Sequence, residues 1–147
     1  MSEPTRATLM ETETRESSAV AARLVAKATP RLRELGEQLR MLSPRYALAV
    51  GRGSSDAAAL LAKYLFEARL GLPTVSAAPS IRSIYGRQLN IEKALVLAIS
   101  QSGRSPDLVE FCRSATGADV LRVGMINDAA SPLAKIMDAF LPLEAGP

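Results

Sequence analysis

The sequence of 147 residues contains no histidine and no tryptophan, and its one cysteine is Cys112. Without histidine the chain lacks the usual general base at neutral pH, and a histidine-ligated metal site is excluded. A lone cysteine cannot form a disulfide within the chain, and its apolar neighbours in a helix-like stretch predict a buried, inert thiol. We therefore expect no metal site and a cytoplasmic location.

Long apolar runs and clusters of basic charge are also missing. No apolar run approaches the roughly 18 residues that a membrane span needs, and the polar, acidic start of the chain is unlike a signal peptide. The 18 Lys and Arg side chains barely outnumber the 15 Asp and Glu side chains and are scattered, so neither a nucleic-acid nor a membrane partner is expected. With aromatic residues at 4%, Ala, Leu, Val and Ile must form the core, which is typical of α/β layers.

Short apolar runs separated by helix-length segments predict the fold class. Runs that are apolar on both faces are typical of buried parallel strands, which right-handed crossovers join. The expected strands are residues 46–51, a weaker run at 73–75, 94–99, 120–126 and 139–141. The helices expected between them are residues 56–70, 106–115 and 132–137. We therefore predict an α/β fold with a five-stranded, doubly wound parallel sheet.

Helices are also predicted ahead of the first strand. Apolar residues recur at helical spacing from residue 9 to about residue 27, and a second helix is expected from Pro30 to just before Pro44. Residues 1–8 are expected to form a disordered tail, residues 9–43 a helical segment and residues 44–147 the α/β domain.

Two loops of small polar residues follow the first and third expected strands. They read Gly-Arg-Gly-Ser-Ser at 51–55 and Ser-Gln-Ser-Gly-Arg-Ser at 100–105, and each runs into an expected helix. With a strand order of 2-1-3-4-5, both loops would lie at the carboxyl edge of the sheet where the winding reverses, which is where such sheets bind ligands. Helix N-termini favour anions, glycines allow close approach and serine hydroxyls donate hydrogen bonds, so this pair of loops is suited to a phosphate.

The same residues have a simpler interpretation, since Ser and Gly before a helix are ordinary capping residues. Asp56 and Asp107 fall in the first helical turns, where their carboxylates would satisfy the helix dipoles themselves and repel a phosphate. Neither loop has the Gly-Lys-Ser/Thr end of a nucleotide phosphate loop or the spacing of a dinucleotide site. The pattern alone leaves phosphate binding and helix capping open.

The second loop and its flanks carry a specific resemblance. Residues 98–107, A-I-S-Q-S-G-R-S-P-D, closely resemble the S-Q-S-G-x-S/T-x-D signature of sugar isomerase (SIS) domains. Residues 51–55 and 64–67 are similar to the first loop and helix of that family, and residues 10–16 to the opening of the isomerase part of glucosamine-6-phosphate synthase. Residues 80–86 resemble the glucosamine-6-phosphate deaminase-like branch more than the synthase.

This resemblance, which covers residues 10–147, implies a flavodoxin-like strand order and a homodimeric protein that binds a hexose 6-phosphate or an amino-sugar 6-phosphate. The family reaction moves a proton between C1 and C2 of the opened sugar and so interconverts aldose and ketose, with amination or deamination coupled to it. A carboxylate transfers the proton, and no metal or organic cofactor is required. The family pattern assigns the sugar phosphate to Ser100, Gln101, Ser102 and Ser105, and contacts with the sugar to Ser54 and Ser55.

Two departures from the family pattern bear on activity. Ser17-Ser18 replaces the Gln-Pro of the N-terminal segment, and the sequence ends at residue 147, before the second SIS domain that carries the proton-transfer glutamate and the ring-opening histidine of the synthase. We therefore expect the binding half of an isomerase, deaminase or aminotransferase-like enzyme and assign no catalytic residue. The start, Met1-Ser2-Glu3, lacks the cysteine nucleophile of a glutaminase domain, which favours the deaminase or isomerase branch.

Two other functions compete with this one. SIS domains also act as non-catalytic sensors of sugar phosphates behind DNA-reading helices, but the acidic residues at positions 11, 13 and 16 are unlike a basic recognition helix. The chain would otherwise be a structural fragment whose loops only cap helices.

Overall fold

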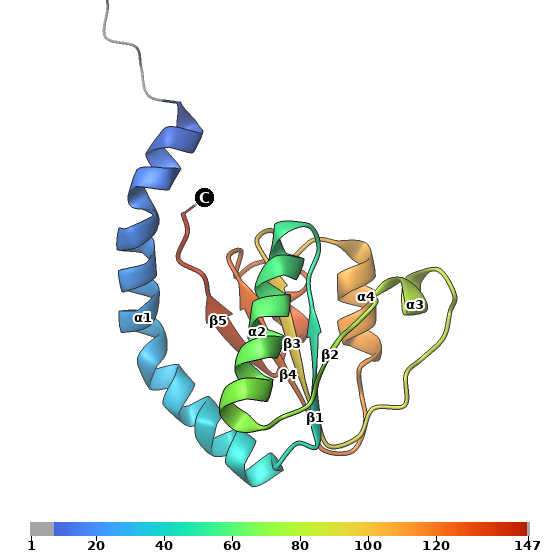
Figure 1. Ribbon diagram of the computed structural model, residues 1–147. Helices are drawn as coiled ribbons and strands as arrows, with labels where there is room; N and C mark the ends of the chain where they lie inside the picture. Colours follow the sequence, from blue (N-terminus) through green and yellow to red (C-terminus); the bar gives the residue numbers. More distant parts are fainter. Residues whose placement is uncertain (1–7, 147) are drawn as a thin grey trace, which may run out of the picture.

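Five parallel strands form one sheet in the computed structural model, which describes residues 8–146 (Figure 1). Their order is β2-β1-β3-β4-β5, and each neighbouring pair runs parallel. The predicted α/β class, strand order and doubly wound sheet are therefore confirmed. The strands are β1 Tyr46–Val50, β2 Thr74–Ser76, β3 Ala94–Ser100, β4 Val120–Ile126 and β5 Ala139–Pro142.

The helices largely follow the sequence pattern, with two differences after β2. The pattern does not predict the short helix α3, and the helix predicted at residues 132–137 is only a 3₁₀ turn, η1. The elements are α1 Leu9–Leu42, α2 Ser54–Leu70, α3 Ser80–Ser83, α4 Pro106–Ser114 and η1 Ala134–Ile136.

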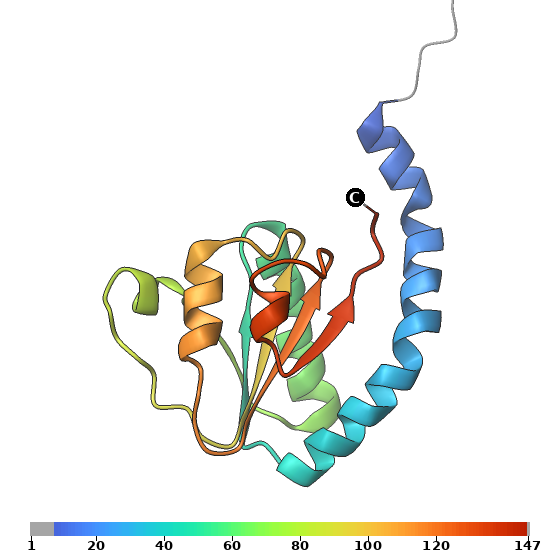
Figure 2. The same ribbon diagram turned by 180° about the vertical axis from the view of Figure 1, so that it is seen from behind.

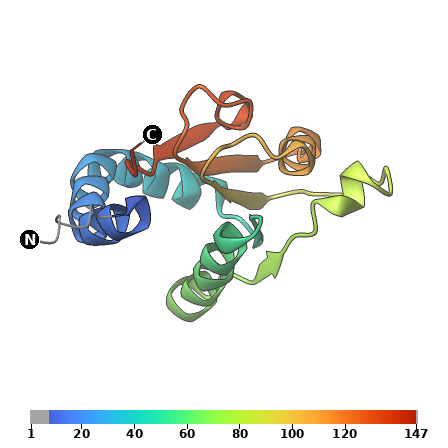
Figure 3. The same ribbon diagram turned by 90° about the horizontal axis from the view of Figure 1, so that it is seen from above.

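The central strand β3 shows why runs that are apolar on both faces predict buried strands. All of its residues are buried, and successive side chains point to opposite faces of the sheet. The even-numbered residues from Ala94 to Ala98 share a core cluster with α4, whereas the odd-numbered residues from Leu95 to Ile99 pack beneath α1 and α2. Figure 3 shows α1 and α2 on one side of the sheet with α4 on the other, and Figure 2 shows α4 and η1 from that second side.

The prediction of two N-terminal helices is wrong, because α1 is one continuous helix with Pro30 inside it. A proline in a helix removes one backbone hydrogen bond and crowds the preceding turn, which bends the helix more often than it ends it when both halves are packed. Ala28 and Leu35, on either side of Pro30, are both buried against the sheet, and α1 curves along its length (Figure 1). Packing on the sheet thus holds the two halves together.

The start of α1 bears on the tail predicted at residues 1–8. That tail lies outside the described residues except for Thr8, whose hydroxyl accepts a hydrogen bond from the Glu11 N–H. Thr8 is therefore the N-cap of α1.

Cys112 lies in α4 with its side chain fully buried in the core. Burial disfavours the thiolate and raises the pKa of Cys112 to about 12, although the charge of Arg122 opposes that rise. The thiol therefore serves as a small apolar core group. Of the helices within residues 8–146, none combines the length and apolar character needed to cross a membrane.

Candidate functional site

The two serine-rich loops lie side by side at the carboxyl edge of the sheet. Strands β1 and β3 are hydrogen-bonded neighbours, with Val50 opposite Ala98, so the chain leaves both strands at the same edge. A side-chain contact also links the segments beyond the two strands, because Nη1 of Arg52 in the first loop is 3.4 Å from Oδ2 of Asp107 in the first turn of α4. The predicted juxtaposition of the loops is therefore confirmed.

Glycines shape the first loop, residues 51–55. A Cβ on Gly51 would lie 2.5 Å from the carbonyl oxygen of Ser55, so this position lets β1 and the start of α2 approach closely. Gly53 has φ +57° and ψ −129°, a conformation that side chains disfavour, and it occupies the N-cap of α2. As a result α2 begins at Ser54 without a side-chain cap.

Ser54 and Ser55 lie at the rim of an open hollow beside α2. Apart from the two serines its lining is apolar and includes Ile99, Met125 and Leu143, and its volume is about 400 Å³. Pockets of roughly 300–1,000 Å³ are typical of small-molecule sites. The hollow is therefore large enough for a small molecule, with the two hydroxyls as its polar side chains.

The second loop, residues 100–105, is built around its own hydroxyls. The buried Ser100 Oγ accepts a hydrogen bond from the Gly103 N–H at 3.0 Å, and Ser102 Oγ accepts one from the Arg104 N–H at 3.3 Å. Each hydroxyl keeps its own proton for a further acceptor. Gln101 is exposed on the same loop.

Ser105 occupies the N-cap of α4, as predicted, but does not cap the helix through its hydroxyl. Its backbone is extended, Pro106 follows in the first turn, and its side chain makes no hydrogen bond to the helix. Asp107 contributes one such bond instead, since its Oδ1 accepts from the Leu108 N–H at 2.9 Å. The capping that the sequence left as an alternative is thus made partly by Asp107, while Ser105 remains available to another group.

A third loop, after β4, also borders the site, and sequence reasoning missed it. The Asn127 N–H donates to the Ser100 carbonyl at 3.3 Å, and Asp128 Oδ2 accepts from Arg104 Nη2 at 2.7 Å. The Ala130 N–H and then Arg104 hold the pKa of Asp128 below its ordinary value. The signal that could have revealed this loop is Asn-Asp directly after a strand that ends at the same edge.

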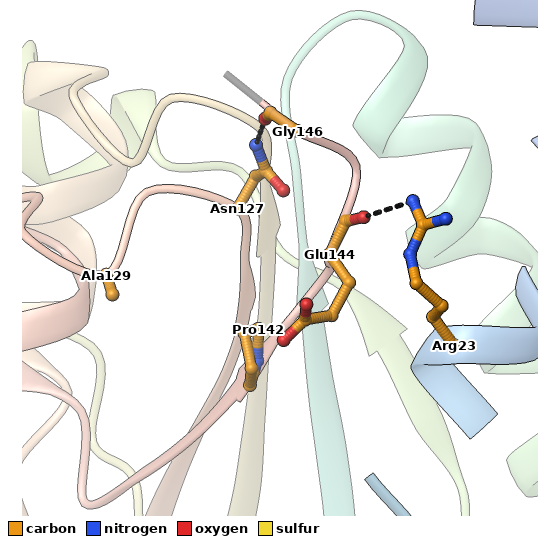
Figure 4. A pocket seen from close by; sticks show the side chains of 6 residues that line it. All are labelled: Arg23, Asn127, Ala129, Pro142, Glu144 and Gly146. Carbon is orange, nitrogen blue, oxygen red and sulfur yellow. Dashed lines mark hydrogen bonds between the residues drawn. The ribbon is translucent and has the colours of Figure 1, made fainter. Parts of the chain in front are cut away.

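Figure 4 shows a further cavity beyond β5, beside the C-terminal segment. Asn127 holds that segment by accepting from the Ala145 N–H and donating to the Gly146 carbonyl. The Glu144 carboxylate pairs with Lys27 of α1 at 2.6 Å, while its carbonyl faces Arg23. Glu144 therefore links α1 to the C-terminal end of the domain. Within residues 8–146, no group of three or more acidic or cysteine side chains could hold a metal ion.

Comparison with known proteins assigns this chain to a family. The SIS domain model matches residues 41–147. Glutamine–fructose-6-phosphate aminotransferase [isomerizing] of Pyrococcus horikoshii is 35% identical over 101 residues, which are 68% of this chain but only 17% of that protein. The chain thus spans less than a fifth of this curated relative.

Two solved structures resemble the whole fold. A protein from Silicibacter pomeroyi DSS-3, assigned as a phosphosugar isomerase, matches with a TM-score of 0.86 and 39% identity over 92% of this chain and 42% of its own. The C-terminal domain of glucosamine-fructose-6-phosphate aminotransferase from Francisella tularensis matches with a TM-score of 0.80 and 21% identity, over 100% of this chain and 42% of its own. At that identity the second match supports the fold alone.

Proposed function

Because the chain belongs to the SIS domain family, we propose that it binds a hexose 6-phosphate or an amino-sugar 6-phosphate at the carboxyl edge of β1 and β3. The main support for this proposal is that the two serine-glycine loops lie next to each other and each leads into a helix. Neither helix start is capped by a serine side chain. Helix N-termini and free hydroxyls suit an anion with a polar body, and the 3.4 Å contact between Arg52 and Asp107 brings a guanidinium from the first loop to the start of α4.

We assign the phosphate to Ser100, Gln101, Ser102 and Ser105, and the sugar to Ser54 and Ser55. The position of Ser105 at the N-cap of α4 supports the first assignment, and the hollow bordered by Ser54 and Ser55 supports the second. The matching proteins are named as an isomerizing aminotransferase and a phosphosugar isomerase. We therefore place the chain as the binding part of an aldose–ketose isomerase, deaminase or aminotransferase, with residues 44–147 as the SIS domain and residues 9–43 as the helical segment packed on it.

Calorimetry with fructose 6-phosphate and with fructose tests the assignment. The phosphorylated sugar is expected to bind, and Ser102→Ala is expected to weaken it about 5- to 30-fold, or about 1–2 kcal/mol, the scale of a hydrogen bond to a charged group. Ser114→Ala is a matched control, because Ser114 is the last residue of α4, at the end of the helix away from the loop, and its hydroxyl donates to the Phe111 carbonyl. Equal affinity for fructose and fructose 6-phosphate would rule out the phosphate cradle.

A further inference from the structure

Resting on the proposed function, we propose that Arg52 recognises the phosphate of the sugar, and that Asp107 holds Arg52 in place until the phosphate takes it over. Arg52 would then be a binding residue outside the serine motif. Asp107 would tune affinity by competing with the ligand for the same guanidinium.

The backbone around Arg52 is constrained, so its side chain projects from a defined point. Gly51 is packed against the Ser55 backbone too closely for a Cβ, Gly53 has φ +57°, and the Ser55 N–H donates to the Arg52 carbonyl at 3.1 Å. From there the guanidinium extends across to the first turn of α4 and reaches Asp107 at 3.4 Å. It therefore lies between the two loops that form the proposed cradle.

The contact with Asp107 is weak enough to be exchanged. It joins one guanidinium nitrogen to one carboxylate oxygen, and the Arg52 side chain is 60% exposed against 21% for Asp107. Exposed pairs of this kind contribute little to stability, because water and salt screen them. Arginine prefers a phosphate, with which its planar guanidinium forms two parallel, charge-assisted hydrogen bonds.

The charges at this edge indicate why a phosphate would need Arg52. The two loops and the first turns of α2 and α4 carry two carboxylates, Asp56 and Asp107, and two cations, Arg52 and Arg104. Arg104 is held more closely, since Asp128 lies 2.7 Å from it against 3.4 Å between Asp107 and Arg52. Without Arg52, a phosphate dianion would face the two aspartates with only neutral donors and the partial charges of the helix ends in its favour.

Asp107 has a second partner and can release Arg52 without being left unpaired. Its Oδ1 accepts from the Leu108 N–H at 2.9 Å, so only the interaction of Oδ2 with Arg52 has to be given up. Removing the Asp107 charge should therefore free Arg52 and ease the entry of the phosphate.

Calorimetry tests this exchange. The affinity for fructose 6-phosphate is measured for the wild-type chain, for Arg52→Gln and for Asp107→Asn. We expect Arg52→Gln to weaken binding at least tenfold and to make the affinity less sensitive to added NaCl, because one charge contact with the phosphate is lost. Asp107→Asn is expected to tighten binding two- to fivefold. Arg31→Gln is the matched control, since Arg31 forms an exposed ion pair with Glu34 on α1. This variant should bind fructose 6-phosphate with the same affinity as the wild type.

The outcomes separate this inference from the function on which it rests. If the wild-type chain binds fructose 6-phosphate no better than fructose, the proposed function itself fails. If the wild type binds and Arg52→Gln binds equally well, only the role of Arg52 is refuted. Asp107→Asn could instead weaken the binding of fructose 6-phosphate as much as Arg52→Gln does, with the melting temperature unchanged. That result would mean that the ion pair only supports the loops, and it would also refute the proposed exchange.

Discussion

At the scale of single residues, Gly103 is the position on which the second loop depends most. Its φ of +62° belongs to the left-handed region, and a Cβ there would collide with the side chain of Ser131. Ser131 is fully buried and its Oγ accepts from the Ala134 N–H, while the Leu133 N–H donates to the Gly103 carbonyl. The loop is therefore packed directly against the turn that precedes β5.

Gly103→Ala is expected to lower the free energy of unfolding by about 2–6 kcal/mol, since backbone strain and overpacking each contribute about 1–3 kcal/mol. Gly86→Ala is the matched control, because Gly86 has φ +64° with open space around it and should show only strain, about 1 kcal/mol. Urea unfolding of both variants measures the difference. If both variants lost the same free energy of unfolding, the side chain of Ser131 would have to move aside for the added Cβ without destabilising the fold.

At the scale of the elements, β5 is a short edge strand. Side-chain hydrogen bonds hold it to β4 in addition to the backbone hydrogen bonds between the two strands. Asp138, the residue before β5, accepts hydrogen bonds from the Arg122 backbone N–H, Nε and Nη2 at 2.8, 3.0 and 2.7 Å. These bonds hold the pKa of Asp138 below its ordinary value, although partial burial opposes the shift. The ionised carboxylate therefore fastens the start of β5 to β4.

Asp138→Asn is expected to lower the free energy of unfolding at pH 7 by about 1 kcal/mol, because the pair is only partly buried and water screens it. A lowered folded-state pKa contributes stability above the unfolded value of about 3.9 that is lost as the pH falls through the folded value. The difference between wild type and variant should therefore shrink as the pH falls below about 5, and it should be lost once the pH is below the lowered folded-state pKa of Asp138.

Denaturant unfolding at several pH values measures this difference. Glu34→Gln is the control, since its exposed pair with Arg31 should contribute no more than a few tenths of a kcal/mol, so that variant should stay close to the wild type throughout. A difference for Asp138→Asn that persists undiminished at pH 2 would contradict the assignment of the stabilisation to the ionised carboxylate.

At the scale of the whole molecule, turnover at the proposed binding edge would need a proton-transfer group beside the sugar. Moving a proton between C1 and C2 of a sugar requires a base within hydrogen-bond reach of those carbons. The chain has no histidine, Asp107 is engaged by the Leu108 N–H and Arg52, and Glu144 is paired with Lys27. We therefore expect this chain to bind the sugar phosphate without turning it over.

An assay of ammonia release from glucosamine 6-phosphate tests that expectation. Formation of the ketose is followed in parallel. The 147-residue chain should give no rate above buffer. A rate well above buffer would show that residues 1–147 hold a complete catalytic site.

Local sequence pattern alone indicated the buried parallel strands and the helix starts that follow them, whereas the strand order came from the resemblance to the SIS family. The residues of β3 are apolar at nearly every position because both faces are covered, so the strand could be recognised without any knowledge of its partners. The Ser-Gly loops and Pro106 after Ser105 likewise predict helix starts from neighbours in the chain. These features depend on residues a few positions apart, which is the range over which sequence patterns are informative.

Only the tertiary structure decided which distant residues meet. Pro30 bends α1 rather than ending it, because Ala28 and Leu35 are both held on the sheet. The contacts of Arg52 with Asp107 and of Arg104 with Asp128 join residues 55 and 24 positions apart, and no local pattern encodes them. They arise because parallel crossovers return each strand to the same edge, so that the charges of three separate loops converge there.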